Sequence, residues 1–150
     1  MAQRESISVI LRITSPTLSP KEIEARLGIK PDESWNLGDR VGTFKAVQKM
    51  HGYELHSTVF MTAPLVEHFR GMIKRIAPVA QKIGEISAQG VVEMICVLHL
   101  KALPPMTFDR DDIRWIAALG ARLDFDIMLI ADRQEPKKPA PGAPGAPPTT

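Results

Sequence analysis

The histidines are the side chains with the widest chemical range in this sequence, because imidazole both binds metals and transfers protons near neutral pH. There are four of them, His51, His56, His68 and His99. No two lie about three to five residues apart on one expected helix, the spacing that favours a compact zinc site. The spacing therefore predicts no metal ligands.

Cys96 is the single cysteine and has the identity of a nucleophile. Met94 and Leu98 share its side of an expected strand, and an apolar setting raises the pKa of a thiol and suppresses the reactive thiolate. We therefore expect Cys96 to be a core residue. A single cysteine forms no internal disulfide, which favours a reducing compartment and hence the cytoplasm.

An acidic cluster of Asp109, Asp111 and Asp112 offers oxygen ligands for Mg²⁺. The cluster stands at the start of an expected helix, where capping and the helix dipole already explain carboxylates. We expect it to be structural. The sequence also lacks a Walker A loop, a GxGxxG turn, a GxSxG elbow and an HExxH helix. It therefore predicts no catalytic residue and no cofactor.

Alternating apolar residues and helix-boundary signals predict the elements that position these groups. The helix starts combine a capping residue with proline in the first turn, as at Ser19-Pro20. The first half of the chain is expected to form a strand over Ile7–Ile13, a helix from Ser19 to Gly28, an edge strand within 32–52, and a strand over 53–61 after a turn at His51-Gly52. The second half is expected to form a helix capped by Thr62 and broken at Pro78, a strand over 91–101, and a helix capped by Asp109 that bears Ile113, Ile116 and Ala117. The last expected element is a strand with Leu123, Phe125, Ile127 and Leu129 on its core face.

This order predicts an α+β fold, a ferredoxin-like βαββαβ unit with an appended helix and strand. We expect a mainly antiparallel sheet with helices on one face and the other face open. Residues 1–133 have the length of one globular domain. Residues 134–150 contain six prolines and no large apolar side chain, so we expect them to form a disordered tail.

The charge balance excludes two classes of partner. The chain carries 19 Lys plus Arg and 17 Asp plus Glu, a formal charge of +2. This balance lacks the concentrated basic excess that nucleic acid or an anionic membrane attracts. No apolar run reaches the roughly 18 residues of a membrane span, and residues 1–15 lack a secretory h-region. We expect a soluble protein.

The strand side chains that point away from the core predict a candidate binding surface. The first strand would be central, between the strands bearing His56 and His99, which places Arg12 among carboxylates and imidazoles. Apolar residues share this face, and such a mixture is typical of contact surfaces; a face that is solvated or covered by residues 32–52 is the alternative. The candidate binding residues are Arg12, Glu54, His56, Phe60, His99 and Asp126 on the sheet, and Trp35 in the loop 32–52.

Arg12 and His56 are expected to serve binding alone. Both lie on the side of their strands that faces away from the core, so we expect replacement of both by Ala to leave stability nearly unchanged.

Three segments carry a resemblance to a known family. They are residues 17–31, TLSPKEIEARLGIKP; the helix break Ile76-Ala77-Pro78; and residues 119–127, LGARLDFDI. Together they resemble the bacterial family catalogued as domain of unknown function 4279, over roughly residues 6–130. The resemblance supports the fold and implies no activity, although some members are similar to immunity proteins that neutralise bacterial toxins. Tyr53 departs from the family, which often has Trp at the start of the middle strand.

Three functions stay open. The first is a non-enzymatic interaction module, immunity-like or accessory, that binds another protein, such as a toxin, or a second copy of itself. The second is a ferredoxin-like sensor whose small ligand contacts Arg12, His56 and Asp126. The third is an enzyme with His56 or His99 as general base, which needs a cleft. A pocket between Trp35 and the sheet would favour the ligand, and a flat surface would favour the protein.

Overall fold

The structure, a computed structural model, describes residues 4–43 and 46–131; the tail expected at 134–150 lies outside them. Within these ranges the strands are β1 (Ser6–Ser15), β2 (Glu33–Trp35), β3 (Arg40–Val41), β4 (Ala46–Val47), β5 (His51–His56), β6 (Val91–Leu100) and β7 (Ala121–Leu129). The helices are α1 (Pro20–Leu27), α2 (Leu65–Ile76), α3 (Ala80–Ile86) and α4 (Arg110–Ala118), and short 3₁₀ turns at Ala77–Val79 and Ser87–Gln89 flank α3.

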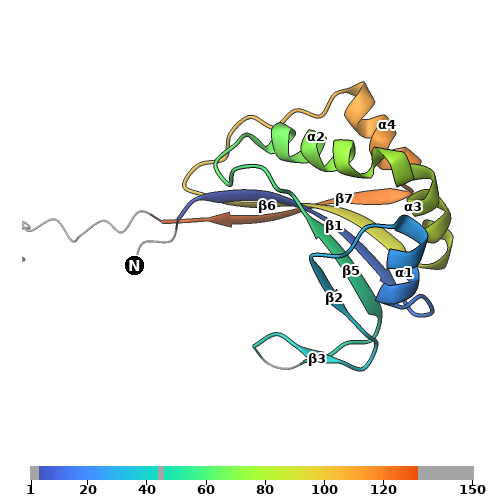
Figure 1. The fold of residues 1–150 in the computed structure, drawn as a ribbon. Coiled ribbons are helices and arrows are strands. Elements are labelled where there is room, and N and C mark those ends of the chain that lie inside the picture. Colours follow the sequence, from blue (N-terminus) through green and yellow to red (C-terminus); the bar gives the residue numbers. More distant parts are fainter. Residues whose placement is uncertain (1–3, 44–45, 132–150) are drawn as a thin grey trace, which may run out of the picture.

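The main sheet has five strands in the order β2-β5-β1-β6-β7 (Figure 1). Strand β1 pairs antiparallel with β5 and β6, β5 pairs antiparallel with β2, and β6 pairs parallel with β7. The helices lie over one face, and the two-stranded ribbon of β3 and β4 projects from the β2 end. The expected α+β class and mainly antiparallel sheet are confirmed, with β1 between the strands that bear His56 and His99.

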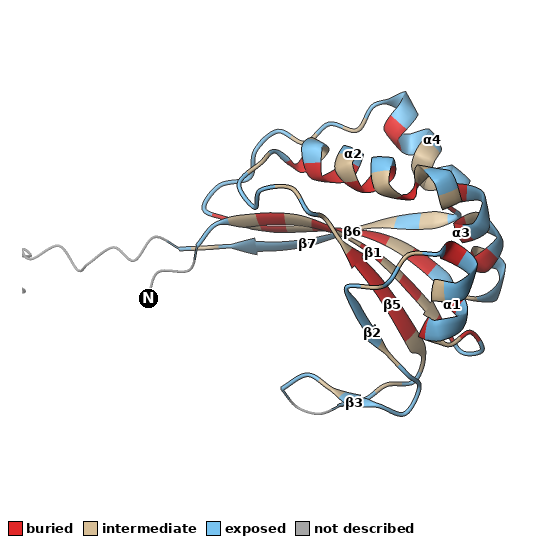
Figure 2. Ribbon diagram, in the orientation of Figure 1, coloured by how far each residue is buried: buried red, intermediate tan, exposed pale blue. Residues whose placement is uncertain are grey.

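The core lies between the sheet and the helices (Figure 2). Every second residue of β1 is buried, and the even-numbered positions from Val92 to Leu100 on β6 are buried as expected. Helix α2 turns a continuous apolar side toward this sheet: Leu65, Phe69, Met72, Ile73 and Ile76 are all buried. Such burial is the main favourable contribution to folding. None of the helices in the described ranges has the length and apolar character needed to cross a bilayer.

The ends of α1 form as the local sequence predicts. Ser19 accepts a hydrogen bond from the backbone N–H of Glu22 at 3.2 Å, and Gly28 ends the helix at a φ of 69°. A left-handed residue of this kind favours glycine. The family departure at Tyr53 is also accommodated: the ring is buried, and its hydroxyl donates to the carbonyl of Ile29 at 2.6 Å.

Cys96 lies on the buried side of β6, where burial raises the pKa of its thiol to about 12. Almost no thiolate is present at neutral pH, so a thiol reagent is expected to label the native protein far more slowly than the urea-unfolded protein. Following both reactions with a chromogenic disulfide reagent checks this. Equal rates would show that this side of β6 opens readily to solvent.

Two expected boundaries around β5 are wrong. His51 and Gly52 lie within β5, and the strand ends at His56 instead of continuing to Met61. The reason is Ser57: its N–H donates to the carbonyl of Val9, and its hydroxyl oxygen accepts the N–H of Val9, which ends the pairing with β1. Helix α2 then begins at Leu65 without a side-chain cap, so Thr62 is not the capping residue.

The apolar residues of the last helix and strand are less buried than expected. Ile113 and Ala117 on α4 are exposed, while Asp112 is buried and completes a capping box with Asp109. On β7, the expected core residues Phe125, Ile127 and Leu129 are also exposed. Strand β7 lies at the sheet edge, and its second half extends beyond the helices (Figure 2).

Candidate functional site

A row of charged side chains crosses the open face at one level of the sheet. Arg12 on β1 stands opposite Glu54 on β5 and Glu93 on β6. Glu33 on β2 stands opposite Glu54, and Arg122 on β7 stands opposite Glu93. Paired residues in register point to the same side of a sheet. All five strands therefore contribute one charge to this charged row.

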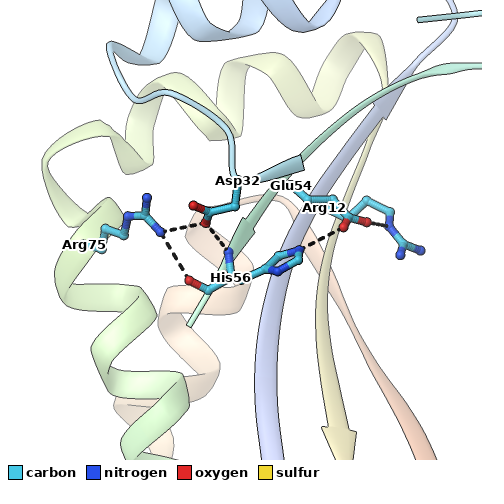
Figure 3. Close-up of polar contacts among 5 residues, drawn as sticks. All are labelled: Arg12, Asp32, Glu54, His56 and Arg75. Carbon is cyan, nitrogen blue, oxygen red and sulfur yellow. Dashed lines mark hydrogen bonds and ion pairs between the residues drawn. The ribbon is translucent and has the colours of Figure 1, made fainter. Parts of the chain in front are cut away.

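The centre of the charged row is a buried carboxylate with two partners (Figure 3). Arg12 Nε donates to Glu54 Oε2 at 2.5 Å, and His56 Nε2 lies 3.1 Å from Glu54 Oε1. Glu54 is only 3% exposed. The structure thus brings together three of the predicted residues. The burial of Glu54 argues against the expectation that Arg12 and His56 are dispensable for stability, because removing the partners of a buried carboxylate is strongly destabilising.

The backbone of His56 is held by two residues that sequence reasoning missed. Asp32 accepts the N–H of His56 at 2.7 Å, and Arg75 on α2 donates to both Asp32 and the carbonyl of His56 (Figure 3). The hydrogen bond from His56 is the main cause that lowers the pKa of Asp32. No local pattern marks Asp32 or Arg75, since they meet only when α2 packs beside the end of β5.

Trp35 lies over the sheet beside Arg12. It stands opposite Gly52 in register, and a side chain at Gly52 would collide with the indole ring. The guanidinium carbon of Arg12 is 6.0 Å from the centre of this ring, within the range of a cation–π interaction. A cleft of about 560 Å³ opens here, lined by Trp35 and Arg12 and by Val41 and Gln48 from the ribbon side. The cleft therefore lies beside Trp35 and not between Trp35 and the sheet, because the indole ring packs directly against Gly52.

The β7 end of the charged row is a second ionic cluster. Arg122 donates to Glu93 and to Asp124, each at 3.0 Å. Burial, followed by the hydrogen bond with Asp124, raises the pKa of Glu93, and that hydrogen bond is the main cause that lowers the pKa of Asp124. Glu93 is thus the first of the two to take up a proton. Arg122 was missed, although extending the alternation of β7 backward by one step would have placed it on this face.

The remaining predicted residues lie apart from this cluster. His99 stands opposite Ser6 and Met128, six residues along β6 from Glu93 or roughly 20 Å. Asp126 is exposed opposite Val97. Phe60 is 83% exposed but lies in the loop after β5, so its expected place on the sheet face is wrong. The site therefore centres on Arg12, Glu54, His56 and Trp35.

A serine–histidine pair lies beneath the same end of β5. Ser57 Oγ is 2.8 Å from His68 Nδ1 and also accepts the N–H of Val9. The tautomer of His68 sets which of these two groups donates the hydrogen bond. His68 Nε2 is buried without a hydrogen-bond partner among the described residues. The pair therefore links the residue after β5 to helix α2 through a largely enclosed imidazole.

The stability of the fold is expected to fall in mild acid because of His68. Burial lowers the pKa of His68 below its ordinary value of 6.5, so the unfolded chain binds this proton more readily than the folded chain. Stability from this source is complete above about pH 6.5 and declines below it, by at most about 1.4 kcal/mol per pH unit. Urea unfolding at pH 7, 6 and 5 measures the decline, and His68→Leu should flatten it. An equal slope in the variant would assign the decline to other groups.

Comparison with known proteins gives one match. The family described as "Domain of unknown function (DUF4279)" matches residues 5–129, which include every strand and helix of the fold from β1 to β7. None of the curated proteins and none of the solved structures matches the chain. Because the match covers most of the chain and agrees with the segments noted in the sequence, this protein belongs to the DUF4279 family.

Proposed function

We propose that the protein is a non-enzymatic interaction module that binds a basic surface of another protein through the open sheet face. The observation that carries this proposal is the segregation of charge. The face has two positive and five negative side chains, a formal charge of −3, whereas the whole chain has +2. The residues concerned are Arg12, Arg122, Glu33, Glu54, Glu93, Asp124 and Asp126.

Apolar side chains on the same face support a protein partner. Trp35 is partly exposed and Met128 is exposed, and they lie on the two edge strands of the sheet. Protein interfaces combine such groups with a charged periphery, and opposite potentials speed association and select partners. Tight binding alone can neutralise a toxin, so a basic toxin is the specific partner that the immunity-like interpretation proposes. An acidic face disfavours nucleic acid and anionic membranes, and the single cysteine supports a cytoplasmic location.

Reversing one exposed charge tests the proposal. Asp126→Lys changes the formal charge of the face from −3 to −1 and, as a surface substitution, should alter stability by no more than about 0.5 kcal/mol. We expect capture of basic proteins from a lysate of the source cells to fall at least about tenfold, and wild-type capture to weaken between 50 and 300 mM salt. Glu85→Lys, which makes the same charge change on α3, is the control. Equal capture by both variants, or capture that is insensitive to salt, would contradict the proposal.

A small ligand in the cleft beside Trp35 is the second candidate. The cleft of about 560 Å³ is the observation that favours it, because this volume lies within the range of ligand sites. Screening small metabolites by thermal shift, with Trp35→Ala as the negative control, separates this candidate from the first. A ligand would stabilise the wild-type protein and not the variant.

A further inference from the structure

We propose that Glu33, Glu54 and His56 form a binding site for a divalent transition-metal cation, with Zn²⁺ as the first probe. One donor atom from each residue lies within 4.8 Å of the other two. His56 Nε2 and Glu54 Oε1 are 3.1 Å apart. Two ligands bonded to one zinc ion at about 2.0–2.1 Å stand roughly 3.0–3.4 Å apart, so these two atoms already have the separation of neighbouring ligands.

An unbalanced negative charge supports a cation at this point. Glu33 and Glu54 stand directly opposite each other on neighbouring strands, and like charges in that position destabilise a sheet. Arg12 balances Glu54 through Oε2. The side chain of Glu33 makes no hydrogen bond or ion pair with any residue of the described ranges. A cation shared by the two carboxylates would remove the repulsion, and the burial of Glu54 strengthens its attraction for that cation.

The surrounding residues hold two of the ligands in place. Arg12 binds one oxygen of Glu54 and leaves Oε1 directed toward His56, while Asp32 and Arg75 fix the backbone of His56 (Figure 3). Metal sites depend on such supporting partners for ligand orientation. The adjoining cleft, which Glu33 and Glu54 line, provides an entry path and leaves further coordination positions to water. One imidazole with two carboxylates and no thiolate suits Zn²⁺ or Mn²⁺.

The spacing of histidines within a helix, the criterion applied to the sequence, does not detect this site. The ligands come from two strands that meet in the sheet, with Glu33 separated from Glu54 by the whole β3–β4 ribbon. The inference goes beyond the proposed function, because metal binding at this site requires no partner protein.

Calorimetric titration of the untagged full chain with ZnCl₂, after removal of metals by a chelator, tests the proposal. We expect one equivalent to bind, and Glu33→Gln and His56→Ala each to weaken binding at least about tenfold. His99→Ala removes an imidazole from the same face and should bind as the wild type does. Thermal melts accompany each titration. Glu33→Gln is the decisive variant because Glu33 has no described partner to lose, and its melt should match the wild type.

Absence of saturable zinc binding by the wild type overturns the proposal. Unchanged affinity in Glu33→Gln overturns it as well, since the cation would then be bound elsewhere. A loss of affinity in His99→Ala equal to that in His56→Ala would show nonspecific binding to surface histidines and would also overturn it. Asp126→Lys separates the metal site from the partner surface. It should impair protein capture and leave zinc affinity within a factor of about three, because β7 is separated from β5 by β1 and β6 and salt screens charges that far apart.

Discussion

Replacing Arg12 by Ala is expected to lower the free energy of unfolding by about 3 kcal/mol, near the lower end of the range for breaking a buried ion pair. The value is low because the Arg12 side chain is 35% exposed and water can partly replace it. Glu54 is buried, and without Arg12 it retains only His56 as a side-chain partner among the described residues. For a domain of this size the loss corresponds to a decrease of roughly 6–12 °C in the melting temperature.

A double-mutant cycle identifies the cause. Glu54→Gln removes the buried charge while keeping the shape of the side chain, so Arg12→Ala should cost much less in that background. Arg114→Ala on α4 is the matched control, because Arg114 and its partner Asp111 are 71% and 82% exposed, and an exposed pair contributes less than about 1 kcal/mol. If Arg12→Ala costs the same in the wild-type and Glu54→Gln backgrounds, the ion pair does not explain the loss.

Gly52→Val is expected to destabilise the protein by about 2–3 kcal/mol, the upper part of the usual range for overpacking. Gly52 lies within β5, where valine is otherwise a favourable strand residue. Its side chain would enter the space of the Trp35 ring, so either the ring or β2 must move away from the sheet. Displacement of Trp35 would also open the cleft and change the tryptophan fluorescence of the folded state.

Removing the ring tests this account. In a Trp35→Ala background the valine meets no indole, so Gly52→Val should be neutral or stabilising there. Chemical unfolding of the two single variants and the double variant measures the coupling. Additive effects would mean that strain in β5 itself, and not contact with Trp35, disfavours a side chain at position 52.

The elements that could be predicted are those with local causes. The alternation in β1 and β6, the Ser19 cap with Gly28 after α1, and the helix break at Pro78 each depend on residues only a few positions apart. Period and capping chemistry operate over this range, and the structure confirms them. The central place of β1 also followed, because few topologies accommodate this order of strands and helices.

The elements that were missed depend on partners distant in sequence. Strand β5 ends at His56 because Ser57 takes the N–H of Val9, a contact across 48 positions that no local pattern records. In the site, Arg12 and Trp35 were identified from their strand side and position. That Glu54 is buried, and that Asp32 and Arg75 hold His56, follows only from packing. Side chains on the open side of a sheet are exposed on average, so Arg12 was expected to contribute little to stability.

The central position of β1 also sets the order of events during synthesis. Ile7 is in register with Leu98, so β1 leaves the ribosome about ninety residues before its neighbour β6. At typical elongation rates this interval lasts roughly 5–20 seconds, much longer than hydrophobic collapse. During that time β1 has only β5 as a neighbour in the sheet, and only helices α1, α2 and α3 are available to cover its apolar side. Nascent chains halted before β6 should therefore be the ones that chaperones bind.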